Sequence, residues 1–119
     1  MNAWDDLPNA AHIDRVVAHS QSNPDKWSAA RDANWYADWD EAWDEAKNAI
    51  WRIASRDAAW DEVKDAATDA AWDACAALIA WDEAGDLMDK PASFVRFLAE
   101  EGVHAAILLL PAVVAMENS

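Results

Sequence analysis

The apolar residues between positions 35 and 53 recur at the spacing of an α-helix. When each residue advances about 100° around a helix axis, these side chains fall on one stripe. Asp40, Glu41, Asp44 and Glu45 fall on the opposite face. The pattern therefore predicts an amphipathic helix with acids outward and the following residues inward: Trp35, Trp39, Ala42, Trp43, Ala46, Ala49, Ile50 and Ile53.

This helix cannot continue indefinitely, although no glycine or proline follows Pro24 until Gly85. At about 1.5 Å per residue, a straight helix over that stretch would exceed the size of a small domain. The same helical phase would also place Asp57 in the apolar stripe. We therefore expect a hairpin turn at about residues 54–57, with Ser55 or Asp57 capping the next helix.

A second apolar stripe begins at Trp60 and continues to Trp81. It predicts one helix from about Asp57 to Ala84, ended by Gly85. The latter half of this helix carries a further apolar strip, formed by Trp72, Cys75, Ala76 and Ile79. Apolar residues on two sides predict that this half is covered on both sides by other helices.

The remaining patterns predict helices at both ends of the chain. Asn9 is expected to cap a first helix with Ile13, Val16 and Val17 inward, and Pro24 to end it. A short helix with Phe94, Val95, Phe97 and Leu98 is expected after a cap at Asp89 or Ser93, with its end at Gly102. The apolar run 103–116 predicts a buried core helix packed on the second apolar strip and kinked or divided at Pro111.

Composition supports an all-α fold. The chain has 119 residues, with two glycines and four prolines, and its abundant alanine favours helix over strand. We expect a compact single-domain helical bundle over residues 1–119, with four or five helices and the apolar C-terminal helix in the core. The lone Cys75 and the absence of a secretory signal favour the cytoplasm. The 14-residue run is shorter than the roughly 20 residues that span a bilayer.

Charge narrows the class of partner. The net charge is -14, which disfavours direct binding to nucleic acid or a membrane and favours a basic protein. Such a partner would be a nuclease toxin or a nucleic-acid-binding protein, held by electrostatic complementarity. The acids concentrate in residues 38–45 and 57–73. The predicted partner-binding residues are Asp38, Asp40, Glu41, Asp44, Glu45, Trp51, Asp61, Glu62, Asp65 and Asp69.

Trp51 and Trp72 lie off the inward stripes of their own helices. Exposed tryptophans commonly anchor interfaces, but another helix could instead cover them, an interpretation that the sequence favours for Trp72 and leaves open for Trp51. If they are exposed, the alternative function is a structural or assembly module that self-associates, for example as a homodimer, through tryptophan-bearing helix faces.

Catalytic and metal-binding patterns are weak. Glu101 and His104 have the Glu-x-x-His spacing of di-iron bundles, but no second copy occurs. His12 and His19 share a helix face without a third ligand near them in sequence. Cys75 lies in apolar sequence, where a thiol is usually inert, and no phosphate loop or nucleophile elbow is present. We expect a non-enzymatic protein without catalytic residues, cofactor or metal.

Three segments resemble a known family: "ARDANWYADWDEAWDEA", "RDAAWDEVKDAATDAAWDACAALIAWDEAGDLMDKP" and "HAAILLLPAVVA". They are similar to small alanine- and tryptophan-rich proteins of bacteria and phages that are catalogued as immunity proteins of toxin systems. The resemblance covers roughly residues 24–116. It implies a compact helical protein of microbial or phage origin and supplies no catalytic residues.

Overall fold

Helices make up every regular element in the computed structural model, which describes residues 2–52 and 54–117. Within these residues there are 8 α-helices rather than four or five. They are α1 (Ala10–Ser22), α2 (Pro24–Ala33), α3 (Trp39–Trp51), α4 (Ala54–Ala66), α5 (Trp72–Ala80), α6 (Gly85–Met88), α7 (Ala92–Glu100) and α8 (His104–Glu117), with a 3₁₀ turn, η1 (Asp69–Ala71), before α5. The all-α prediction is confirmed.

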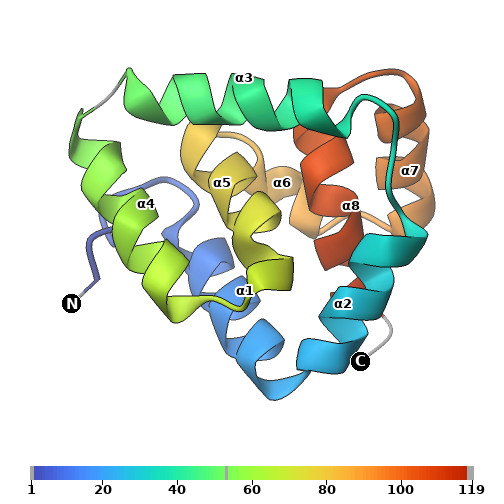
Figure 1. Cartoon of the computed structure of the whole chain (residues 1–119), viewed down its shortest axis with the longest axis horizontal. Helices are drawn as coiled ribbons and strands as arrows, with labels where there is room; N and C mark the ends of the chain where they lie inside the picture. Colours follow the sequence, from blue (N-terminus) through green and yellow to red (C-terminus); the bar gives the residue numbers. More distant parts are fainter. Residues whose placement is uncertain (1, 53, 118–119) are drawn as a thin grey trace.

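The helices pack around a central α5. In Figure 1, α3, α4, α1 and α2 follow the outline of the molecule, and α5 lies inside that outline. Helix α8 contacts α7, α3, α2, α5 and α6. The radius of gyration is 12.7 Å, close to the roughly 13.5 Å expected for a compact domain of this length.

Side-chain amides, rather than glycine or proline alone, end the first two helices. Helix α1 stops before Pro24, as predicted, and the Asn23 side chain donates a 3.0 Å hydrogen bond to the His19 carbonyl. At the end of α2 the buried Asn34 makes the same type of bond, 2.7 Å, to the Ala30 carbonyl. Each bond satisfies a carbonyl that helix termination leaves without a partner. The break after α2 was not predicted.

The loop after α2 changes the position of Trp35. The stripe pattern placed this residue inward on one helix with Trp39, but α3 begins only at Trp39. Trp35 lies in the preceding loop and is 60% exposed. The inward prediction is therefore wrong for Trp35, because helical phase has no meaning across a break.

The turn between α3 and α4 comes earlier than expected. Helix α3 ends at Trp51 and α4 begins at Ala54, so residues 54–57 belong to the new helix. The residue at position 53, part of the predicted inward stripe, lies outside the described residues. Two helices meet here, as the helical phase predicted, but their boundary lies before residue 54.

The predicted helix from Asp57 to Ala84 is divided. Thr68 is extended, with φ -71° and ψ 159°, and separates α4 from η1 and α5. Gln21 of α1 donates to the Ala66 carbonyl, and Arg31 of α2 donates to the Asp69 carbonyl. Neighbouring helices thus satisfy the backbone at this break, which the periodicity of one segment cannot reveal.

A buried asparagine joins α1 to the end of α5. Asn9 precedes α1, but its side chain does not cap that helix. It donates 2.8 Å hydrogen bonds to the Leu78 and Trp81 carbonyls and accepts one from the Gly85 amide. Gly85 opens α6 instead of ending a long helix. A Cβ at this position would lie 2.4 Å from the Asn9 side chain, so the contact requires glycine.

Helices α5 and α8 supply much of the apolar interior. Residues 74–79 of α5 are all buried. In α8, Ala106 to Val113 are buried without interruption. Helix α8 runs through Pro111 as a single helix rather than two pieces. Proline removes one backbone hydrogen bond, a cost that the surrounding apolar burial offsets.

Among the described residues, the one with a positive φ, Gly102, lies in the turn between α7 and α8. The pattern correctly predicted the short helix with Phe94 and Val95, although Pro91 rather than Asp89 or Ser93 occupies its N-cap position. Gly102 has φ 86°, a conformation that glycine adopts without a steric cost. It turns the chain so that α8 begins beside α3.

Candidate functional site

The outward face of α3 is an exposed row of carboxylates. Asp40, Glu41, Asp44 and Glu45 are exposed, while Trp39, Ala42, Ala46, Ala49 and Ile50 are buried. This confirms the predicted amphipathic orientation for these residues. Among the lysine, arginine and histidine side chains that the structure describes, none forms an ion pair with Asp40, Glu41 or Asp44. We call these three residues the α3 acid row. Asp38, also exposed, precedes the helix at its N-cap position.

The acids of α4 and η1 form a second set. Asp61, Asp65 and Asp69 are exposed, and Glu62 is partly buried. The Glu62 carboxylate accepts a 2.8 Å hydrogen bond from the Ala3 amide, so it secures the N-terminal segment. In Figure 1, α4 descends steeply from the end of α3. Asp69 lies in η1, beyond the far end of α4, and these four acids stay predicted partner-binding residues.

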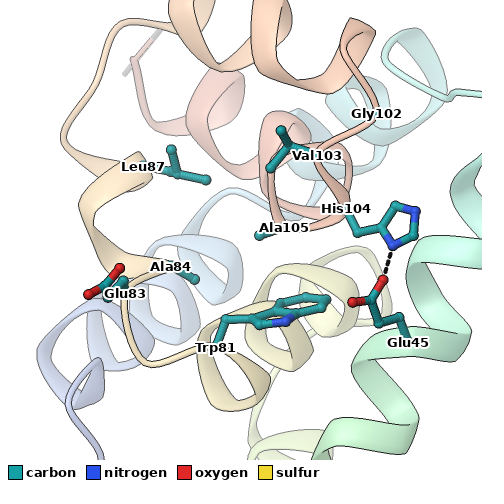
Figure 2. Close-up of a pocket in the computed structure, with 9 residues that line it drawn as sticks. All are labelled: Glu45, Trp81, Glu83, Ala84, Leu87, Gly102, Val103, His104 and Ala105. Carbon is teal, nitrogen blue, oxygen red and sulfur yellow. Dashed lines mark hydrogen bonds and ion pairs between the residues drawn. The ribbon is translucent and has the colours of Figure 1, made fainter.

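A hollow of about 540 Å³ includes Glu45, the residue after the α3 acid row, in its lining. Four different parts of the chain form it, and Figure 2 shows the side chains around it. Its lining consists of Glu45, Trp81, Glu83, Ala84, Leu87, Gly102, Val103, His104 and Ala105. Trp81 and Glu83 follow α5, Leu87 belongs to α6, and the Gly102 turn brings in the start of α8.

A carboxylate and an imidazole meet at the rim of this hollow. His104 Nδ1 and Glu45 Oε2 are hydrogen bonded, as the dashed line in Figure 2 marks. Both side chains are partly exposed. Glu83 is exposed on another side of the opening, and the Trp81 indole forms part of the wall. Its polar side chains are two carboxylates, one imidazole and the indole of Trp81, and the rest of its lining is apolar or glycine.

The combination suits a cation carried on an apolar stem. Carboxylates attract an ammonium or guanidinium group, and an indole face adds a cation–π attraction of about 0.5–2 kcal/mol. Leu87, Val103 and Ala105 would contact the stem. Glu83, His104 and Trp81 were not predicted as members of one site, because His104 is distant in sequence from the other two and no motif links them.

The histidines are engaged separately. His104 pairs with Glu45 instead of acting with Glu101, which is exposed. His19 Nδ1 accepts a 2.8 Å hydrogen bond from the Trp27 indole, and burial, with a contribution from Lys26, lowers its pKa. His12 lies 3.9 Å from an Asp89 oxygen. Within the described residues, no group of three histidine, cysteine or carboxylate side chains could hold a metal ion.

Two buried groups have raised pKa values. Burial raises the pKa of the Cys75 thiol to about 12, and the Asp73 charge adds to the effect. Burial also raises the pKa of Asp73 to about 6, against an opposing attraction to Arg31. Cys75 is fully enclosed, so its thiol remains protonated at neutral pH and cannot reach a substrate.

The tryptophans divide between core and surface. Trp39 is buried, and Trp43, Trp60 and Trp81 are partly buried against the core. Trp51 is 65% exposed, the outcome that the sequence left open. Trp72 is partly buried in α5.

No protein-family model, curated protein or solved structure matches this chain. Within the described residues, no helix is both long and apolar enough to cross a bilayer. The functional assignment therefore depends on the site geometry described above.

Proposed function

We propose that this protein is a non-enzymatic acidic binding protein that occupies a basic surface of a protein partner. The supporting observation is the α3 acid row, three exposed carboxylates that form no ion pair with any described side chain, followed in sequence by Glu45, which lines the hollow. Immunity proteins and DNA-mimicking inhibitors use the same electrostatic logic, which also agrees with the resemblance noted in the sequence. The partner would be a nuclease toxin or a nucleic-acid-binding protein.

Long-range charge and a local anchor would have different roles in this complex. The net charge of -14 would attract a basic protein and accelerate association. The hollow would receive one lysine or arginine side chain between Glu83 and Trp81. A well-packed anchor of this kind mainly slows dissociation.

The first experiment compares two variants with equal charge changes. One carries Asp40→Asn, Glu41→Gln and Asp44→Asn, and the other carries Asp61→Asn, Asp65→Asn and Asp69→Asn. Glu45 and Glu62 are excluded because they hold His104 and Ala3. Association with an arginine-rich peptide is followed at two ionic strengths, and then with the natural partner once it is purified.

The α3 variant should associate more slowly than the α4 variant and show a weaker salt dependence. Equal rates in the two variants would assign the effect to net charge and remove α3 as the interface. Glu83→Gln should mainly raise the dissociation rate. If dissociation is unchanged, the hollow does not anchor the partner, and the acid row alone remains.

Self-association is the alternative function, supported by the exposed indoles of Trp35 and Trp51. An exposed tryptophan is a frequent interface anchor. Light scattering after size exclusion tests it directly. A stable dimer that Trp51→Ala converts to monomer would favour the assembly module, and a monomer at all ionic strengths would exclude it.

A further inference from the structure

A second hollow, of about 240 Å³, lies between α3, α4 and α5 and has an unusual lining. Four tryptophans and two lysines form it: Trp43, Lys47, Trp51, Trp60, Lys64 and Trp72. We call it the tryptophan–lysine pocket. It shares no lining residue with the hollow beside Glu45.

The spacing within the helices explains how these side chains meet. Trp43, Lys47 and Trp51 are four residues apart, so they form a ladder along one side of α3. Trp60 and Lys64 have the same spacing on α4. The Trp43 and Trp60 rings lie 5.7 Å apart and tilted by 58°, and the Lys64 ammonium lies 5.6 Å from the centre of the Trp72 ring.

Two features leave the pocket chemically incomplete. Neither Lys47 nor Lys64 forms an ion pair within the described residues, although acids outnumber lysine and arginine by 23 to 9 in the chain. The Trp72 Nε1 atom is buried and has no hydrogen-bond partner. A buried donor without an acceptor costs about 1–3 kcal/mol.

We propose that the tryptophan–lysine pocket binds a small planar aromatic carboxylate. The indoles would contact the ring, and the two ammonium groups would attract the carboxylate. The volume falls below the roughly 300–1,000 Å³ of pockets for drug-sized ligands, which limits the ligand to one or two fused rings. The two lysines give this pocket a positive charge, whereas the α3 acid row is negative. The anionic ligand proposed here therefore differs from the basic partner proposed above.

The test uses indole-3-acetate as the probe and indole-3-acetamide as its neutral counterpart. The indole N–H signals of the 9 tryptophans are followed by NMR during titration, after assignment with single Trp→Phe variants. Indole-3-acetate should shift the signals of the four lining tryptophans and leave that of Trp27, which is fully buried elsewhere, unchanged. The expected dissociation constant is about 0.1–1 mM.

Matched lysine variants test the charge requirement. Lys47→Gln and Lys64→Gln should each weaken indole-3-acetate binding by about tenfold, while Lys90→Gln, with the same charge change outside the pocket, should not. The proposal fails if the acetamide binds as well as the acetate, or if no lining indole shifts. It also fails if these signals move with protein concentration in the absence of probe, since that result identifies a contact between copies of the chain.

Discussion

The helix pairs α5–α8 and α3–α4 have opposite relations to solvent. Residues 74–79 of α5 and 106–113 of α8 are buried in unbroken runs. In α3, burial follows helical spacing, and buried residues alternate with exposed acids. In α4, Ala59 and Val63 are buried while Asp61 and Asp65 are exposed. We infer that the inner pair determines stability and that the outer pair provides the surfaces for binding.

The first prediction contrasts an inner leucine with an outer tryptophan. Leu109 of α8 is completely buried, so Leu109→Ala should reduce the free energy of unfolding by about 2–5 kcal/mol. Trp51→Ala removes a larger but mostly exposed side chain and should cost less than about 1 kcal/mol. Chemical denaturation of both variants gives the two values. Similar losses would contradict the division between inner and outer pairs.

The second prediction concerns the connection of α1 to the inner pair. Asn9→Ala removes two donated hydrogen bonds and the acceptor for the Gly85 amide. Leaving these buried groups without partners should reduce stability by about 1–3 kcal/mol. The matched change Asn48→Ala, on the exposed side of α3, should alter stability by less than about 0.5 kcal/mol. A negligible loss for Asn9→Ala would show that water replaces the amide.

Side-chain hydrogen bonds to the backbone explain why the helix boundaries could not be predicted from periodicity. The inward and outward faces of α3 could be predicted from its own sequence, because the spacing of apolar residues within a helix indicates which side chains are buried. The breaks after α2 and α4 instead involve Asn34, Gln21 and Arg31, whose hydrogen bonds end or secure helices. Gln21 and Arg31 donate hydrogen bonds to backbone carbonyls that are distant in sequence. No pattern within either segment predicts such a hydrogen bond.

The candidate site, like the fold, could be predicted only in the parts that depend on a single helix. The exposed acids of α3 followed from helical phase, and their exposure is confirmed. The two hollows were not predicted, because each combines side chains from at least three elements. For Trp51, only the position of α4 and α5 determines that the indole is exposed at the edge of a pocket.

The third prediction uses Asp73, an acid in the first turn of α5. Its folded pKa of about 6 exceeds the ordinary value of 3.8 because of burial. The folded state therefore binds the proton more tightly, and the stability contributed by protonation is lost as pH rises from about 4 to 6. A shift of about two pKa units corresponds to a change of at most about 3 kcal/mol. Asp73→Asn should flatten this part of the stability curve relative to the unmodified chain, whereas Asp40→Asn on exposed α3 should leave it in place.

The smallest expected effect separates two acids within the outer pair. Asp44 lies three and four residues after Glu41 and Asp40, and like charges at this spacing repel by a few tenths of a kcal/mol. Asp44→Asn should therefore stabilise the protein by about 0.2–0.5 kcal/mol. Asp40 also repels Asp44, but it lies in the first turn of α3, where a negative charge interacts favourably with the helix dipole by about 0.3–1 kcal/mol. Asp40→Asn should accordingly be neutral or slightly destabilising.

Thermal unfolding at low ionic strength compares the stabilities of the two variants, and the difference should shrink at about 1 M salt, where the screening length falls to roughly 3 Å. If both variants gain the same stability, repulsion between the acids outweighs the interaction with the helix dipole. The stability gained by neutralising an acid of α3 then does not depend on its position along the helix.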